Sequence, residues 1–397
     1  MYKRPVYQIL QQKLLEKRLF LQIISGPRQV GKTTLVQQVL NELSCVYHYA
    51  TADEPGLLDH TWIEAQWHIA RKKINNENKK PVILALDEVQ KIPEWSTIVK
   101  KLWDEDTRSK TSLQVVLLGS SSLLMQKGLE ESMAGRFEII NLPHWFFSEM
   151  RDAFGWALDK YIYFGGYPGA AAIVNDEPRW AKYVTDSLIE PTITRDILLL
   201  NPIYKPVLLR QLFQLGCHYS GQILSLQKML GQLHDAGNTT TLSHYLELLY
   251  GAGMLTGLQK YSGPVVKQKA SSPKLQVLNN ALMNSQSDIN FALARQNHEY
   301  WGRLVESAIG AHLVNSAFGS KKIQVFYWRS GNFEVDFVIK KGAKIIALEV
   351  KSTRREVSLP GMAEFKKVYK NATPLLVGGS SGVALEEFLS KPLSEWL

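Results

Sequence analysis

The feature that most constrains the fold is a glycine-rich loop near the N-terminus, with the sequence GPRQVGKTT over residues 26–34. It follows a short apolar run, 21–25, and opens a segment with helical spacing, 33–43. Glycines at both ends of the loop let backbone N–H groups converge on an anion, and the helix start adds its positive dipole end. The pattern therefore predicts a phosphate-binding loop between a buried strand and a helix.

Within this loop we expect two side chains to act directly on a nucleotide. Lys32 would reach the terminal phosphates and stabilise their charge, and the Thr33 hydroxyl would ligate Mg²⁺. The whole loop is assigned to nucleotide binding: Gly26, Pro27, Arg28, Gln29, Val30, Gly31, Lys32, Thr33 and Thr34.

An acidic pair supports this assignment. Asp87 and Glu88 directly follow the run PVILAL (81–86), about 55 residues beyond the loop. A continuous apolar run of that length is typical of a strand buried on both faces of a parallel sheet. We expect Asp87 to hold Mg²⁺, mostly through water, and Glu88 to polarise the attacking water as general base. The alternative is an ordinary acidic surface turn.

Three more polar residues are candidates near the phosphates. Ser120 ends the next apolar run, LQVVLL (113–118), and would orient water. Arg136, in AGRF, would sense the phosphate or serve as an arginine finger toward a neighbouring subunit. A solvated or ion-paired arginine is the alternative for Arg136, and Arg195 in TRDIL is a further candidate of the same kind.

Four motifs together resemble a prokaryotic AAA-type, archaeal-ATPase-like family over nearly the whole chain: GPRQVGKTT, LDEVQKIPEW, LLGSSS followed by AGRFEIINLP, and YIYFGGYP. The resemblance implies an α/β P-loop NTPase domain with a parallel sheet in the additional-strand order of that class. It also implies a following winged helix, a C-terminal domain of uncharacterised function, ATP as ligand and Mg²⁺ as cofactor.

The length of 397 residues predicts two or three domains. We expect a P-loop ATPase domain over 1–155, a helical and winged-helix domain over 156–274, and a small α/β nuclease-like domain over 275–397. The second helix of the predicted winged helix, 239–250, carries no Lys or Arg, which favours a structural or interdomain role for it. The basic loop after it keeps four candidates for contact with a nucleic-acid backbone: Lys260, Lys267, Lys269 and Lys274.

Carboxylates in the C-terminal third form a second pattern, in the predicted hairpin EVDFVIKKGAKIIALEVKS (334–352). With a two-residue turn at Lys341-Gly342, Asp336 lies opposite Ala347 and diagonal to Glu349. The period of two then places Asp336, Glu349 and Lys351 on one face of a half-exposed sheet, with the apolar residues on the other.

This arrangement resembles the PD-(D/E)xK nuclease pattern. The resemblance implies that Asp336 and Glu349 bind Mg²⁺ and that Lys351 orients or activates water for phosphodiester attack. Glu306, near the edge of the apolar stripe of the helix predicted around 299–316, is the candidate for an additional acidic ligand. Two alternatives remain: an amphipathic hairpin with solvated charges, and a retained nuclease-like fold that does not cleave.

The charge and the cysteine content limit which partners and metal sites the chain can have. Lys and Arg number 21 against 19 Asp and Glu in residues 1–160, 7 against 7 in 161–260, and 18 against 11 in 261–397. The net charge of +9 therefore comes mainly from the last third. Two interpretations of this basic charge remain, a surface that binds DNA or RNA and an ordinary solvated surface. The two cysteines, Cys45 and Cys217, lie far apart, which excludes a Cys-based zinc site and makes a disulfide scaffold implausible.

These patterns together predict a cytoplasmic protein that binds ATP, hydrolyses it with Mg²⁺, and couples nucleotide state to a nuclease-like C-terminal domain. The alternative is a regulatory nucleotide-binding module whose C-terminal domain is a protein- or DNA-interaction surface without cleavage. No membrane partner is expected, and the possibility of a homo-oligomer is left open.

Overall fold

The computed structural model describes residues 1–53, 59–74, 81–119, 133–198, 203–234, 237–262, 271–320, 322–353 and 358–397. The chain divides into two compact units, Met1–Leu142 and Pro143–Leu397. The first division thus comes before the predicted boundary at 155/156. The predicted boundary at 274/275 falls inside a strand of the second unit, β7 (Lys274–Val277), so the separation into three domains stays a prediction.

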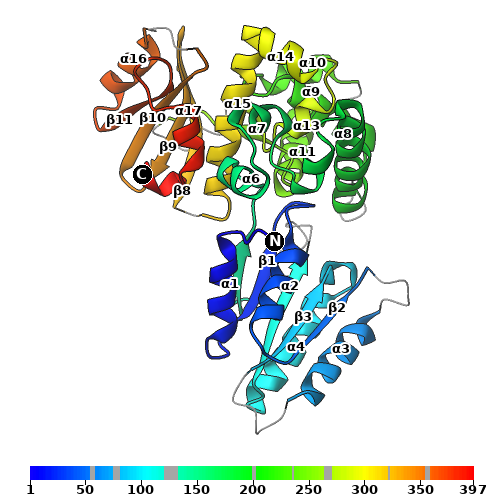
Figure 1. The fold of residues 1–397 in the computed structure, drawn as a ribbon. Coiled ribbons are helices and arrows are strands. Elements are labelled where there is room, and N and C mark those ends of the chain that lie inside the picture. Colours follow the sequence, from blue (N-terminus) through cyan, green and yellow to red (C-terminus); the bar gives the residue numbers. More distant parts are fainter. Residues whose placement is uncertain are drawn as a thin grey trace. The chain divides into compact units, whose positions relative to one another are not determined.

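The first unit is built around a sheet that, in the described ranges, has five parallel strands in the order β2-β3-β4-β1-β5. Strand β4 lies between β1 and β3, which is the additional-strand order that the family resemblance implies. Figure 1 labels β1, β2 and β3 of this sheet. The elements are α1 (Val6–Leu15), β1 (Leu21–Ser25), α2 (Lys32–Glu42), β2 (Tyr47–Thr51), α3 (His60–Lys72), β3 (Val82–Asp87), the 3₁₀ turn η1 (Val89–Lys91), α4 (Trp95–Arg108), β4 (Leu113–Gly119) and β5 (Phe137–Asn141).

Helices cover both faces of this sheet. Helices α1 and α2 pack Leu10 and Val36 on one face against Ile24 and Val116. Helices α3 and α4 pack tryptophans, including the fully buried Trp67, on the other face. The central strands β1, β3 and β4 are buried along their whole length, which explains their continuous apolar runs in the sequence. The predicted parallel α/β sheet is confirmed.

The second unit begins with helices and ends with a mixed sheet. Its first part contains α6 (Phe147–Phe154), α7 (Leu158–Phe164), the 3₁₀ segment η2 (Pro168–Ile173), α8 (Glu177–Tyr183), the π-helical segments η3 (Val184–Ile189) and η4 (Thr192–Leu198), α9 (Pro206–His218), α10 (Leu226–Gln232), α11 (Thr239–Gly251), β6 (Leu255–Leu258), β7, α13 (Ala281–Asn284) and α14 (Phe291–Gln296). Strands β6 and β7 pair antiparallel after α10 and α11. This is the order that the sequence predicts for helix, turn, helix and strand.

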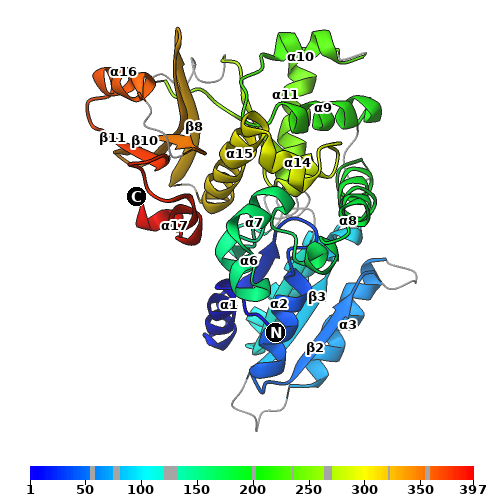
Figure 2. The ribbon, with the colours of Figure 1, turned by 45° about the horizontal axis from the view of Figure 1, so that its top comes forward.

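The last part of the unit contains α15 (His298–Ala317), β8 (Ile323–Ser330), β9 (Phe333–Lys341), β10 (Lys344–Lys351), α16 (Pro360–Val368), β11 (Ala372–Gly378), α17 (Leu385–Ser390) and η5 (Leu393–Glu395). In the described residues β8, β9 and β10 are antiparallel neighbours, and β11 runs parallel to β10 at one edge. Figure 2 shows α15 and α16 on opposite sides of this sheet. The sheet is thus covered on both faces by helices, and the predicted half-exposed sheet is wrong.

Among the helices in the described ranges, none combines the length and apolar character that crossing a bilayer requires.

Candidate functional site

The phosphate loop is shaped by backbone contacts that only small residues permit. Gly31 has φ 88°, in the left-handed region that favours glycine, directly before α2 begins at Lys32. A side chain at Gly26 would place its Cβ 2.1 Å from the carbonyl oxygen of Leu142. The Leu142 N–H also donates to the Ser25 carbonyl, 2.8 Å away, so the chain leaving β5 runs directly against the start of the loop. Both glycines of the motif are therefore required by the backbone.

Lys32 lies buried inside the loop and bridges its first residues. Its Nζ donates to the carbonyl oxygens of Gly26 at 3.0 Å and Pro27 at 2.7 Å. Val30 is fully buried, and its carbonyl accepts a hydrogen bond from the guanidinium of Arg4 at 3.1 Å. The rest of the loop is more open: Arg28 is half-buried, and Gln29 and Thr34 are exposed. The loop thus has a fixed interior and an accessible outer side.

Asp87 collects three donors at the carboxyl end of β3. Its Oδ2 accepts from the Thr33 hydroxyl at 2.6 Å and from the Tyr49 hydroxyl at 2.8 Å, and its Oδ1 accepts from the Glu88 N–H at 2.9 Å. Asp87 is only 4% exposed. Thr33 and Asp87 therefore present two oxygens to one place, and oxygen donors of this kind are those Mg²⁺ takes. These residues fit the Mg²⁺ that the sequence implies.

Glu88 stands next to this carboxylate in an unusual backbone conformation. Its φ is 54°, in the left-handed region that residues with a Cβ seldom adopt, and such positions cluster at functional sites. Its Oε2 accepts from the Gln90 side-chain amide at 2.6 Å.

Tyr49 is part of this site although the sequence did not single it out. It lies on β2, which is the neighbour of β3, and its register partner is Ala85. Burial and the nearby Asp87 charge raise the pKa of Tyr49, so its hydroxyl stays protonated and donates. The sequence offered one indication of this role, because Tyr49 lies two residues before the polar residue that ends its strand. The pairing of that strand with β3, however, joins segments far apart in the chain and is not visible in the sequence.

Arg136 lies at the other end of the sheet. It directly precedes β5, and its carbonyl accepts from the N–H of Leu21, the first residue of β1, whereas the phosphate loop follows the last residue of β1. Its guanidinium binds Asp104 through two hydrogen bonds, at 2.7 and 3.1 Å. This geometry argues against contact with a nucleotide held by the same chain and supports the ion-paired alternative. Ser120 lies outside the described residues, and Arg195 is exposed in the second unit.

The C-terminal hairpin turns one residue later than expected. Lys341 pairs with Lys344, so the two-residue turn is Gly342-Ala343, and Ala347 lies opposite Val338 rather than Asp336. The predicted turn at Lys341-Gly342 is wrong. The register shift is two residues, however, and an even shift keeps each side chain of β10 on the same face.

A bulge changes the position of Asp336 as well. From Val335 to Val338 strand β9 advances three residues while its partner β8 advances two, from Trp328 to Phe326. The extra residue disturbs the pairing of β9 with β8, whereas the register of β9 with β10 is unbroken, so the single face for Asp336 with Glu349 and Lys351 stays a prediction. The paired register of β9 and β10 ends at Phe337, and Asp336 Oδ2 instead accepts from the Val350 N–H at 2.8 Å.

Glu349 and Lys351 form a pair next to Asp336. Lys351 Nζ lies 2.9 Å from Glu349 Oε1, while Glu349 Oε2 is buried and has no hydrogen-bond partner among the described residues. Burial and the Asp336 charge raise the pKa of Glu349, with Lys351 opposing them. Burial works against the ammonium of Lys351, but Glu349 and Asp336 outweigh it and raise the pKa of Lys351. The buried free oxygen of Glu349 and the second oxygen of Asp336 could receive a cation.

Lys274 is the unexpected member of this cluster. The sequence grouped it with a basic loop, but its side chain is fully buried on β7, so contact with a nucleic-acid backbone is excluded for it. Its Nζ lies 2.6 Å from Glu306 Oε1 and donates to the Asp336 carbonyl at 3.0 Å. It also lies 4.7 Å from the centre of the Phe337 ring.

The ion pair with Lys274 changes the interpretation of Glu306. Burial raises the pKa of Glu306 to about 7, and the opposing charge of Lys274 offsets only part of this rise. For Lys274 the burial penalty is outweighed by Glu306 and Asp336, which raise its pKa. The carboxylate of Glu306 is therefore committed to a cation of the protein, which argues against its role as a metal ligand. Across the described ranges, no three His, Cys, Asp or Glu side chains are grouped to hold a metal ion.

The YIYFGGYP motif has a packing role in the second unit. Gly165 has φ 69°, and a Cβ there would meet Asn279 Oδ1 at 1.9 Å. The Gly166 N–H donates to the same amide oxygen at 3.0 Å, and a Cβ on Gly166 would lie 2.1 Å from the Trp145 carbonyl. The two glycines thus allow close contact between distant segments, which requires no catalytic chemistry.

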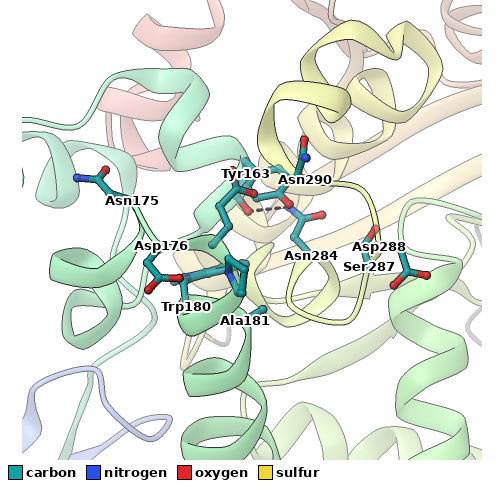
Figure 3. A pocket seen from close by; sticks show the side chains of 11 residues that line it. Tyr163, Asn175, Asp176, Trp180, Ala181, Asn284, Ser287, Asp288 and Asn290 are labelled. Carbon is teal, nitrogen blue, oxygen red and sulfur yellow. Dashed lines mark hydrogen bonds between the residues drawn. The ribbon is translucent and has the colours of Figure 1, made fainter.

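Tyr163 of the same motif lines a polar pocket of about 580 Å³. Figure 3 shows it beside Asn284, whose side-chain amide donates to the Tyr163 carbonyl at 2.6 Å. The Tyr163 hydroxyl donates to the Ile289 carbonyl at 2.7 Å. The polar groups of Tyr163 thus make internal bonds that hold the pocket wall together.

Comparison with known families agrees with the geometry of the first unit. Residues 20–151 match the sequence profile of an AAA domain. The first unit carries an AAA domain. The match identifies residues 20–151 as a P-loop domain of the AAA class, which implies ATP binding by this part of the chain. Two domains of unknown function match the rest of the chain, DUF8612 over residues 155–292 and DUF4143 over residues 301–390. The search of curated protein sequences gave no match.

Among solved structures, the chain is similar to RuvB of Thermotoga maritima, a Holliday junction branch migration motor. The identity is 17% over 63% of this chain and 88% of RuvB, with a TM-score of 0.33. A RuvB variant from the same organism gives 17% identity over 64% and 86% of the two chains, with a TM-score of 0.33. A structure described for katanin self-assembly gives 15% identity over 40% of this chain and 54% of that chain, with a TM-score of 0.28.

Proposed function

We propose that the AAA domain is a Mg²⁺-dependent ATPase whose nucleotide state controls a nuclease-like C-terminal domain. The observation that carries the first part is the arrangement of Lys32, Thr33 and Asp87. The Lys32 ammonium lies buried inside the loop, and the hydroxyl of the next residue, Thr33, donates to the Asp87 carboxylate at 2.6 Å.

The chemistry follows from what each residue can do there. The backbone N–H groups of residues 26–34 and the start of α2 would hold the phosphates, and Lys32 would exchange its bonds to loop carbonyls for phosphate oxygens. Mg²⁺ on Thr33 and Asp87 would supply charge neutralisation. Glu88 would accept a proton from the water that attacks the γ-phosphate, which breaks the bond between the γ-phosphorus and the bridging oxygen.

For the second unit, the proposal rests on Asp336, Glu349 and Lys351. The two carboxylates would hold Mg²⁺ through their remaining oxygens, since Mg²⁺ is commonly held by one or two carboxylates with water and phosphate completing its shell. Lys351 would orient the water that attacks a phosphodiester of DNA or RNA. Segments α10, α11, β6 and β7 would form the winged helix, in an interdomain role. The protein would act in the cytoplasm, and a homo-oligomer would bring a second copy to each AAA domain.

The decisive experiment measures ATP hydrolysis and nucleic-acid cleavage on the same purified chain, with Mg²⁺ or Mn²⁺ and with and without ATP. We expect Lys32→Ala to remove hydrolysis, and Glu88→Gln to keep ATP binding while slowing hydrolysis by about 10²-fold or more. Glu349→Ala should remove cleavage and leave hydrolysis intact. Hydrolysis that persists in Lys32→Ala would contradict the first part.

The alternative function is a regulatory ATPase whose C-terminal domain binds without cutting. The observation that favours it is the ion pairing of both Glu306 and Glu349 with lysines of the protein itself. Under this alternative no cleavage is seen with any metal, and Glu349→Ala leaves all activities unchanged while Lys32→Ala abolishes them.

A further inference from the structure

Lysines gather at one end of the C-terminal mixed sheet. Lys341, the last residue of β9, pairs with Lys344, the first of β10. Lys322 directly precedes Ile323 of β8, which is the partner of Lys341. Lys370 lies two residues before β11, whose first residue pairs with the second of β10. Lys341 and Lys344 lie in β9 and β10, and Lys322 and Lys370 shortly precede β8 and β11 at the same end of the sheet. We call this set the lysine rim: Lys322, Lys341, Lys344 and Lys370.

The charges of the rim are open to solvent and uncompensated. Lys322, Lys344 and Lys370 are exposed, and Lys341 is half-buried. Within the part of the chain that the structure describes, none of the four side chains forms an ion pair, whereas exposed lysines elsewhere in the unit do. Lys182 binds Asp186 at 2.8 Å and Lys391 binds Glu387 at 2.8 Å. Four like charges held together by the sheet without carboxylates repel one another, and a bound polyanion would relieve that repulsion.

The spacing of the rim suits a nucleic-acid backbone. Neighbouring strands lie about 4.8 Å apart, so four strands extend over about 14 Å. One strand of B-form DNA carries a phosphate about every 3.4 Å along the axis, which gives about four phosphates over that length. The turn inside the rim is Gly342-Ala343, and no aromatic side chain is exposed there among the described residues, unlike surfaces that insert into membranes.

We propose that the lysine rim binds the phosphate backbone of DNA without reading its sequence. This rests on the nucleic-acid partner in the proposed function and names the surface that would hold it. Lysine ammonium groups are point charges that lack the paired donors with which arginine reads a guanine edge. The rim lies five residues along β9 from Asp336, or about 17 Å, so it would anchor DNA away from the carboxylates.

The test uses the full chain, a short fluorescent duplex of random sequence, and EDTA without ATP, so that neither hydrolysis nor cleavage contributes. Fluorescence anisotropy is followed over a series of salt concentrations. We expect Lys341→Gln with Lys344→Gln to weaken binding roughly ten-fold and to lower the slope of log K against log salt by about 2. The matched control removes the same charge from the same unit, by Lys182→Gln with Lys391→Gln, and should change neither.

Two results would overturn the proposal. In the first, the wild type binds the duplex and the rim variant binds it with the same affinity and the same slope of log K against log salt. The other is absence of duplex binding, including the case in which the rim holds polyglutamate or phosphatidylserine vesicles instead. ATP hydrolysis, measured separately on the same preparations, shows whether the ATPase proposal stands or fails independently of the rim.

Discussion

The two carboxylate sites of this protein balance their charge in opposite ways. Around Asp87 the donors that the described residues supply are neutral: two hydroxyl groups and one backbone N–H. Around the C-terminal carboxylates the donors include ammonium groups of the protein itself, Lys274 on Glu306 and Lys351 on Glu349. A carboxylate held by neutral donors keeps its negative charge available to an added cation. In a carboxylate that is paired with an ammonium group, this charge is already largely compensated. Acidic residues therefore mark a metal site more securely where no protein cation meets them.

The largest expected effect comes from removing the buried cation of the second site. Lys274→Met should lower the free energy of unfolding by about 3–5 kcal/mol, toward the lower value because Glu306 is 24% exposed. Denaturant unfolding of the full chain measures it. Adding Glu306→Gln should recover much of the loss. Lys182→Met, at a pair whose lysine is 80% exposed, should leave the stability nearly unchanged. A loss that the second substitution does not repair would show that Lys274 acts by packing alone.

A second prediction concerns acid. His312 of α15 is 2% exposed between the rings of Phe146 and Phe388, and burial lowers its pKa from 6.5 to about 4. The unfolded chain therefore binds a proton at His312 more tightly than the folded chain does. The free energy of unfolding is unaffected above about pH 6.5 and decreases as the pH falls toward 4, by up to about 3 kcal/mol.

His312→Phe should remove that part of the pH dependence in unfolding experiments between pH 4 and 7, whereas replacing the exposed His298 by Gln should not. An unchanged slope in the His312 variant would mean that other groups of the second unit cause its acid sensitivity. The result would sharpen the comparison of the two units. It tests whether a buried titratable group makes the second unit sensitive to acid, whereas the donors around Asp87 in the first unit are neutral.

A smaller effect is expected for Tyr49→Phe at the nucleotide site. The substitution removes one hydrogen bond to Asp87 and keeps the ring, which costs about 1 kcal/mol, or about five-fold in the Mg²⁺ dependence of ATP hydrolysis. A titration of hydrolysis with Mg²⁺ measures it. No change in the Mg²⁺ midpoint would place the Tyr49 hydroxyl outside the site. A loss as large as that of Lys32→Ala would make it essential rather than supporting.

The smallest effect is expected for Arg136→Ala. Its exposed pair with Asp104 contributes under about 1 kcal/mol, and its place at the far end of the sheet predicts ATP hydrolysis within about two-fold of wild type in the dilute protein. A large loss that depends on protein concentration would instead reveal an arginine finger between subunits, which is the sequence-based alternative for this residue.

The sequence predicts the first site better than the second because its parts are local. Residues 26–34 and Asp87-Glu88 are contiguous motifs, and the ends of parallel strands bring them together at one edge of the sheet. The pairing of Glu349 with Lys351 was likewise predictable, since residues two apart on a strand share a face. The hydrogen bond from Tyr49 and the ion pair of Lys274 join residues 38 and 32 positions apart, and the bulge at Asp336 depends on strand register. Neither kind of contact leaves a periodic signal.

The position of Lys274 has a consequence for how this protein can be divided. A fragment that starts at 275 would inherit Glu306 and lose the cation that compensates it, although it would contain every residue of the nuclease-like pattern. Engineers who transplant the C-terminal segment should therefore carry β7 with it. For the same reason, a sequence change that keeps Glu306 on α15 should also keep Lys274, which belongs by its order in the chain to the preceding segment.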